Sequence, residues 1–206
     1  MNLWTIKTKI PIALIILRMI IGLLLIVLSM MQVRHYPIIA ISILSVGLIS
    51  DIFDGIIARH LNVSSAFLRR LDSTADQLFF ISIAIATYLQ NPAFFKSNAF
   101  QLAILAITEG LAYLVCFIRF KKEIATHTIG AKIWTLFIFA TLIQVMINGE
   151  STILFSLFFW IGMVTRLEII TILLILKKWT NDVPTVFHSI LIRQGKEIKR
   201  HKLFNG

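Results

Sequence analysis

Four of the ten acidic residues of this chain lie in two closely spaced pairs, one at the end of an apolar stretch over residues 37–57 and one at the start of the next, over residues 72–89. Asp51 and Asp54 are three residues apart and Asp72 and Asp76 are four apart, so each pair shares one face of a helix. A charged side chain inside a membrane helix costs at least roughly 2.5–3.5 kcal/mol, so these acids need partners or a purpose. The loop between the two stretches brings both pairs to similar depth, and we expect the four carboxylates to converge.

Four negative charges in one small volume cannot all stay ionised unless cations neutralise them. The expected ligands are hard carboxylate oxygens, without His or Cys at matching spacing, which favours Mg²⁺, Mn²⁺ or Ca²⁺ over zinc. Two such cations suit phosphate chemistry, because they can hold the attacking and the leaving oxygen together. The spacing therefore predicts a metal-dependent site that acts on phosphate groups.

Small and basic residues beside the acids fit this interpretation. Gly55 and Ala58 carry little side-chain bulk, so a ligand can approach the backbone closely. Arg59 adds a two-pronged phosphate donor at the water boundary. Ordinary close packing of helices through small residues remains the alternative explanation for Gly55 and Ala58.

The composition indicates that membrane helices position these residues. Of the 206 residues, 58% are hydrophobic and 15% are charged, whereas soluble domains have about 45–50% apolar and about 25% charged residues. A chain of this length cannot bury so much apolar surface in its own interior, so the bilayer must take it. This excludes a soluble enzyme, a disordered chain and a disulfide scaffold, and the single Cys116 cannot form an internal bridge.

Six apolar stretches each approach the roughly 20 residues that a helix needs to cross the hydrocarbon core. Backbone amides in lipid must bond within their own segment, so we expect helices. The predicted fold is an all-α membrane protein, a six-transmembrane-helix bundle over residues 1–178, followed by a basic tail over residues 179–206. The predicted spans are approximately Ile10–Met30, Pro37–Ile57, Asp72–Leu89, Phe100–Phe120, Ala131–Ile147 and Thr152–Leu176.

The net charge of +10 is distributed unevenly between the two sides of this bundle. The loops on one side hold only Arg34 and Lys96, while the other basic loop residues and the tail share the opposite side. This asymmetry predicts that both termini and the two long loops are cytoplasmic. The tail is expected either as an interfacial helix or as a solvated basic segment. The basic residues form no stripe with interleaved aromatics, so nucleic acid is not expected as a partner.

The acidic motif resembles the signature of the CDP-alcohol phosphotransferases, D-x2-D-G-x2-A-R-x8-G-x3-D-x3-D. It reads Asp51-Ile-Phe-Asp54-Gly55-Ile-Ile-Ala58-Arg59, followed by Asp72-Ser-Thr-Ala-Asp76, and it keeps every spacing of that signature. Leu68 replaces the second glycine, which predicts a reshaped or partly blocked nucleotide pocket.

The resemblance implies an enzyme that transfers a phosphatidyl group from CDP-diacylglycerol to an alcohol and releases CMP. It also implies two divalent cations, Mg²⁺ or Mn²⁺, and a homodimer in the bacterial inner membrane with its active site facing the cytoplasm. By the resemblance, the metal and pyrophosphate ligands are Asp51, Asp54 and Asp72. Asp76 is the base that deprotonates the acceptor, with metal ligation as a second role. The residues that border the cytidine diphosphate are Gly55, Ala58 and Arg59.

A phosphorylated acceptor needs further cations, and three basic residues are candidates: Lys132, Arg166 and Arg119. Arg166 lies deep within its span and has an alternative role, pairing with Glu109 or with backbone carbonyls. Lys132 has the alternative of simply following the positive-inside bias.

The identity of the acceptor stays open between several alcohols. The chain looks most like a phosphatidylglycerophosphate synthase, which uses glycerol 3-phosphate, and Arg18, seven residues after Pro11, looks like an arginine of the bacterial enzymes. Inositol phosphate, inositol and serine are the alternative acceptors.

Two other classes of protein compete with an enzyme. A cation or proton transporter also carries membrane acids, but it predicts them near the bilayer midplane rather than beside Arg59 at one edge. An inactive, lipid-binding homologue is the second alternative.

Overall fold

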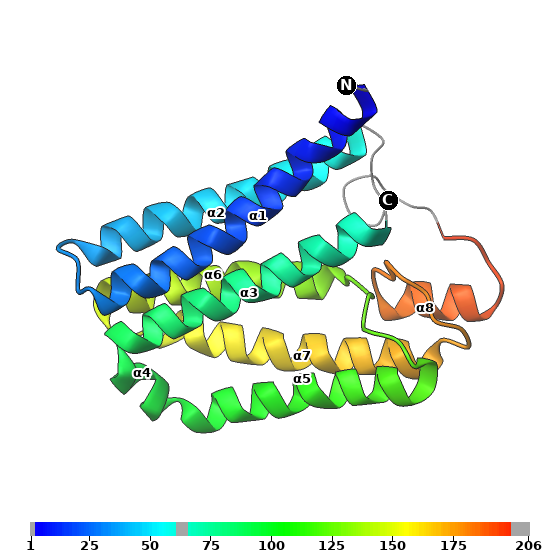
Figure 1. The fold of residues 1–206 in the computed structure, drawn as a ribbon. Coiled ribbons are helices and arrows are strands. Elements are labelled where there is room, and N and C mark those ends of the chain that lie inside the picture. Colours follow the sequence, from blue (N-terminus) through cyan, green and yellow to red (C-terminus); the bar gives the residue numbers. More distant parts are fainter. Residues whose placement is uncertain (1–2, 61–65, 199–206) are drawn as a thin grey trace. The chain divides into compact units, whose positions relative to one another are not determined.

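The computed structural model describes the backbone of residues 3–60 and 66–198, and the side chains of residues 12–50, 53, 71–72 and 74–198. Across these residues the chain is helical and has no strand (Figure 1). It divides into two compact units, which are described separately. The first comprises Met1–Pro92 with Val145–Glu150, and the second comprises Ala93–Gln144 with Ser151–Gly206.

The first unit contains three long helices: α1 (Leu3–Met30), α2 (Tyr36–His60) and α3 (Ala66–Gln90). Each overlaps a predicted span, so the helical prediction is confirmed there. Both α1 and α3 begin earlier than predicted. Hydropathy marks where the apolar surface begins, whereas helical hydrogen bonding continues into the more polar residues before it.

The second unit contains the remaining predicted helices and two short ones. The long helices are α5 (Ala99–Phe120), α6 (Ile129–Asn148) and α7 (Ile153–Ile175), close to their predicted bounds. The last residues of α6 belong to the first unit. The short helix α4 (Pro92–Ser97) was not predicted, and α8 (Val186–Arg193) lies within the predicted tail.

Among the described residues, four helical stretches are long and apolar enough to cross a membrane, which indicates a multi-pass membrane protein. They are Ile12–Met30, Ala99–Phe120, Ile129–Asn148 and Ile153–Ile175. Within the described side chains, α2 contributes a shorter apolar stretch, Tyr36–Ser50. Crossing by α2 and α3, and hence the count of six spans, stays a prediction.

The three helices of the first unit pack around one aromatic side chain. Here α1 contacts both α2 and α3, and Phe79 of α3 is buried. A Cβ built on Gly47 of α2 would overlap the Phe79 ring, and one built on Gly22 of α1 would lie 3.3 Å from Phe79. Phe79 and its helix therefore occupy the space that a side chain at either of these two positions would need.

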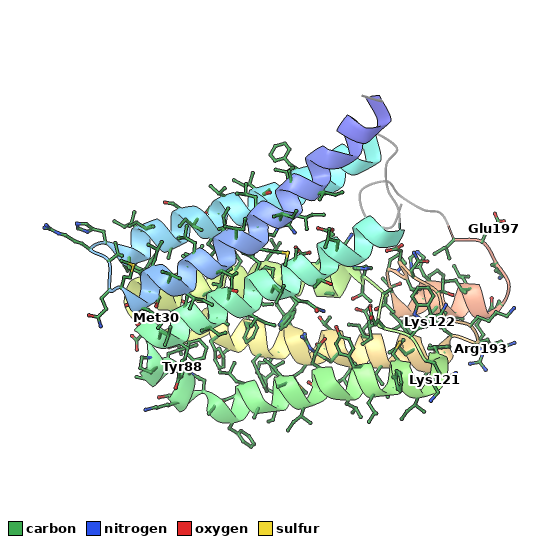
Figure 2. All side chains as sticks on the ribbon, viewed as in Figure 1. Met30, Tyr88, Lys121, Lys122, Arg193 and Glu197 are labelled. Carbon is green, nitrogen blue, oxygen red and sulfur yellow. The ribbon has the colours of Figure 1, made fainter. Side chains whose placement is uncertain are left out.

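Hydrogen bonds join the C-terminal ends of α1 and α3 in the same unit. The Ser29 hydroxyl of α1 donates to the Ala86 carbonyl of α3 at 3.0 Å, and the Gln90 amide donates to the Ser29 carbonyl at 2.8 Å. Met30 and Tyr88 accordingly lie at the same end of the unit (Figure 2). These bonds fix the register of α1 against α3, and so fix which residues meet at the opposite end.

In the second unit, the chain after α7 folds back onto the segment before α6. The Asp182 and Val183 amides donate to the Ala125 and Thr126 carbonyls, each at 2.8 Å. The Ile129 amide donates to the Pro184 carbonyl at 3.0 Å. The beginning of the predicted tail is thus bonded to the bundle, and α8 packs on α7. An interfacial position for α8 stays a prediction.

One carboxylate joins the beginnings of α6 and α8 to α7. Glu168 accepts hydrogen bonds from the Thr128 hydroxyl and the Val186 backbone amide. Thr128 in turn accepts from the Ala131 amide at 3.1 Å, which caps α6. A Cβ on Gly130 would lie 2.8 Å from the Glu168 carboxylate, so a glycine is needed for this approach.

We predict that Gly47→Ala lowers the thermal stability of the purified protein. The added methyl group overlaps the Phe79 ring, and overpacking of this kind costs about 1–3 kcal/mol. The matched control is Gly110→Ala, because no atom lies within 4 Å of the Cβ built there. Thermal unfolding in detergent should show a lower Tm for Gly47→Ala and an equal or higher Tm for Gly110→Ala. Equal behaviour of the two variants would contradict the packing described for Phe79.

We also predict that Glu168→Ala loosens the connection between α7 and α8. The variant leaves the Val186 amide and the Thr128 hydroxyl without their acceptor, at a cost of about 1–3 kcal/mol. Trypsin should then cut faster after the exposed Lys177 and Lys178, as followed by mass spectrometry. The exposed Glu197→Ala serves as the control, and equal cutting rates in both variants would count against the Glu168 contacts.

Candidate active site

The first unit brings one arginine of α1 to both aspartates of α3. Arg18 Nη1 lies 3.3 Å from Asp72 Oδ1 and also contacts Asp76 Oδ1. The Arg18 side chain is 1% exposed, and the side chains of Asp72 and Asp76 are each 35% exposed. The four-residue spacing thus places both carboxylates on one face of α3, where they converge on a single nitrogen.

Apolar packing beside this ion pair sets its position. Ile15 and Ala75 form a buried cluster. Ile15 lies three residues before Arg18, and Ala75 lies between the two aspartates. The partly buried residues packed against them are Ile12, Met19 and Leu71. The α1–α3 contact therefore holds Arg18 level with both carboxylates.

The aspartates of α2 can be placed by their backbone alone. The side chains of Asp51, Asp54, Gly55, Ala58 and Arg59 lie outside the described residues, and so does that of Leu68. Their predicted roles at the site are therefore not addressed by side-chain geometry. The α2 backbone is nevertheless a continuous helix from Tyr36 to His60, which includes both acidic positions.

The contact between α2 and α3 gives the level of those positions. Gly47 meets Phe79, and α2 runs antiparallel to α3 (Figure 1). Asp51 is four residues beyond this contact and Asp76 three, in the same direction. At 1.5 Å rise per residue these steps are about 6 Å and about 4.5 Å. The backbone thus puts Asp51 and Asp76 at similar levels of neighbouring helices.

Two of the four predicted metal ligands, Asp72 and Asp76, have described side chains. Among the described side chains, no group of three His, Cys, Asp or Glu residues is arranged to hold a metal. Asp72 and Asp76 are two members of the predicted set of four, and both already share one cationic partner. Oxygen donors that converge on a cation fit Mg²⁺ or Mn²⁺.

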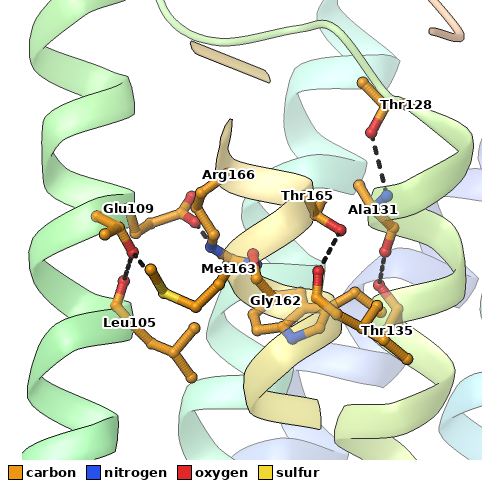
Figure 3. Close-up of polar contacts among 12 residues, drawn as sticks. Leu105, Glu109, Thr128, Ala131, Thr135, Gly162, Met163, Thr165 and Arg166 are labelled. Carbon is orange, nitrogen blue, oxygen red and sulfur yellow. Dashed lines mark hydrogen bonds and ion pairs between the residues drawn. The ribbon is translucent and has the colours of Figure 1, made fainter. Parts of the chain in front are cut away.

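The three proposed acceptor residues lie in the second unit. Arg166 is 5% exposed, and its Nη2 lies 2.7 Å from Glu109 Oε2 (Figure 3). Its Nη1 also donates to the Gly162 carbonyl at 3.3 Å. The guanidinium carbon lies 3.5 Å from the centre of the Trp134 ring. Both alternative partners considered for Arg166, Glu109 and a backbone carbonyl, are therefore present.

The other two candidates lie in more exposed surroundings. Arg119 donates to the Leu174 and Leu176 carbonyls at 2.9 and 3.0 Å, so it caps the end of α7. Lys132 is exposed in the first turn of α6. Basic side chains gather where α5 ends and α8 lies, and Figure 2 labels three of them: Lys121, Lys122 and Arg193.

The pairing of Arg18 with the α3 aspartates was not predicted from the sequence. In the sequence, Arg18 was identified only by its similarity to an arginine of bacterial phosphatidylglycerophosphate synthases. A buried arginine in an apolar span requires an acceptor, and this signal was available. It could not name the acceptor, because Arg18 and Asp72 are 54 positions apart.

Comparison with known proteins supports the family that the acidic motif indicates. A family model described as CDP-alcohol phosphatidyltransferase matches residues 8–192, which include Arg18 and all four motif aspartates. No curated relative and no solved structure matches the chain. Because the family model covers most of the 206 residues, the chain belongs to the CDP-alcohol phosphatidyltransferase family, whose enzymes transfer a phosphatidyl group from a CDP-alcohol.

Proposed function

We propose that this protein transfers the phosphatidyl group of CDP-diacylglycerol to a small polar alcohol and releases CMP. The observation that carries this proposal is the convergence of Asp72 and Asp76 on one cationic nitrogen, within a chain of the CDP-alcohol phosphatidyltransferase family. Glycerol 3-phosphate is the proposed acceptor, and inositol phosphate, inositol and serine are the alternatives.

Each aspartate has a role in this proposal. Asp76 accepts the proton of the acceptor hydroxyl as a general base. The hydroxyl oxygen forms a bond to the phosphorus that carries the diacylglycerol, and the bond from this phosphorus to CMP breaks. Asp51, Asp54 and Asp72 bind two divalent cations, Mg²⁺ or Mn²⁺, with Asp76 as a further ligand. When bound, these cations neutralise charge on the diphosphate and on the departing CMP oxygen.

The remaining motif residues are proposed to border the nucleotide. Gly55 and Ala58 leave room for the cytidine diphosphate beside α2, and Arg59 binds a phosphate oxygen. Leu68 takes the place of the glycine of the family motif, and we propose that this replacement narrows the nucleotide pocket.

Acceptor recognition is proposed to involve the three basic residues of the second unit: Lys132, Arg166 and Arg119. Arg166 is held by Glu109 and Trp134, so its charge is fixed in place before any acceptor arrives. A phosphorylated acceptor gains more from such cations than inositol or serine does, which supports glycerol 3-phosphate or inositol phosphate over these two alcohols.

The proposed setting is the inner membrane of a bacterium, with the active site facing the cytoplasm and two copies forming a homodimer. The exposed basic residues at one end of the second unit (Figure 2) support a cytoplasmic position for that end. A transporter is less well supported, because Arg18 places a buried positive charge against the α3 acids.

We predict that Asp76→Asn abolishes CMP release without unfolding the protein. Loss of the base should lower the rate by about 10²–10⁴-fold, whereas CDP-diacylglycerol binding should persist. The assay contains purified protein, CDP-diacylglycerol, Mg²⁺ or Mn²⁺ and a panel of alcohols, with a chelator as a further control. Absence of CMP with every acceptor, or full activity of Asp76→Asn, would refute the proposed reaction.

We further predict that Lys132→Gln raises the KM for glycerol 3-phosphate about tenfold, because one charge-assisted hydrogen bond of roughly 1.4 kcal/mol is lost. The KM for CDP-diacylglycerol should not change. The exposed Lys121→Gln is the matched control, because it removes the same charge elsewhere in the second unit. A preference of the wild-type protein for inositol or serine would exclude glycerol 3-phosphate as the acceptor.

A further inference from the structure

Arg18 is a permanent positive charge within the candidate active site. Its guanidinium contacts the Oδ1 atom of both Asp72 and Asp76 through a single nitrogen, Nη1. These are two of the four carboxylates proposed to bind divalent cations. An arginine cannot be deprotonated in a protein, so this charge is present under all working conditions.

The position of Arg18 is fixed by its own helix. Ile15 and Ala75 pack α1 against α3 beside the ion pair, and Gly22 meets Phe79 one turn farther along α1. The Arg18 side chain is 1% exposed, so the guanidinium is enclosed by protein rather than by water. The arginine is therefore built into the site and stays close to both carboxylates.

Two consequences follow from this arrangement. Without metal, the guanidinium offsets the mutual repulsion of Asp72 and Asp76 and so stabilises the folded protein. When divalent cations approach, the same positive charge repels them and contacts oxygens that they require. The carboxylates are about one-third exposed, so solvent weakens this competition without removing it.

We propose that Arg18 is an internal competitor of the metal: it holds the two α3 aspartates together in the metal-free protein and raises the metal concentration needed to fill the site. This inference rests on the proposed function, because it requires the aspartates to bind divalent cations. Arg18 is thus a positioning residue with two effects. It lowers the affinity of the site for metal, and it stabilises the folded protein when no metal is bound.

The test is direct binding of Mn²⁺ to the full-length protein in detergent, without substrate, followed by the electron paramagnetic resonance signal of free Mn²⁺. Arg18→Met removes the charge and keeps an apolar side chain beside Ile15. We expect its Kd for Mn²⁺ to fall about tenfold, which corresponds to roughly 1.4 kcal/mol. Arg18→Lys keeps the charge and should give a value between those of wild type and Arg18→Met.

The matched control is Arg166→Met. It also removes a buried arginine from a carboxylate, but it does so in the second unit, among residues that are not proposed metal ligands. Its Kd for Mn²⁺ should equal that of the wild type. Asp72→Asn serves as the second control and should weaken Mn²⁺ binding.

Thermal unfolding supplies a measurement that does not depend on activity. In the presence of a chelator, Arg18→Met should unfold at a lower temperature than the wild type, because Asp72 and Asp76 then repel each other. Saturating Mn²⁺ should raise the Tm of Arg18→Met more than that of the wild type. Arg166→Met should lose the same stability with and without Mn²⁺.

The outcomes separate this inference from the proposed function. Unchanged or weaker Mn²⁺ binding by Arg18→Met, with normal binding by the wild type, overturns the inference alone. Absence of Asp72-dependent Mn²⁺ binding by the wild type overturns the proposed metal site as well. An Arg18→Met protein that folds only with Mn²⁺ supports the inference, and one that fails to fold in either condition contradicts it, because cations then cannot replace the arginine.

Discussion

Charge inside an apolar helical bundle is the constraint on which this structure depends. Asp72 and Asp76 lie beside the buried apolar contact of Ile15 and Ala75, and unpaired carboxylates in such surroundings are costly. Arg18 meets both of them from α1. The second unit also contains a buried charge with its own partners, since Arg166 is paired with Glu109 and stacked on Trp134. Each buried charge in the described part of these two sites has a defined partner.

The packing of the first unit and the chemistry of its site are linked through short distances along three helices. Phe79 occupies the space that Gly22 and Gly47 leave open. Arg18, Asp51 and Asp76 each lie three or four residues from that contact on the same side of it. A change at the glycines would therefore shift the level of the charged residues, even though neither glycine touches a substrate. The small residues around Phe79 serve the site as well as the fold.

The sequence predicted the long helices well, because apolar length and helical spacing are properties of a single segment. It also predicted that Asp72 and Asp76 share a face, and the family follows from the same motif. Contacts between segments that are far apart in the sequence could be predicted less well. The partner of Arg18 was not predicted, and the partner of Arg166 stayed open between Glu109 and a carbonyl. The backbone bonds between residues 182–184 and 125–129 left no side-chain pattern to read.

We propose that aspartates from α2 and α3 surround divalent cations at one level of the membrane bundle. A structure of the wild-type protein soaked with Mn²⁺, with the metal located by its anomalous scattering, tests it most directly. We predict two Mn²⁺ peaks enclosed by carboxylate oxygens of Asp51, Asp54, Asp72 and Asp76. Peaks elsewhere, or α2 carboxylates directed away from those of α3, would contradict the claim and the reaction derived from it.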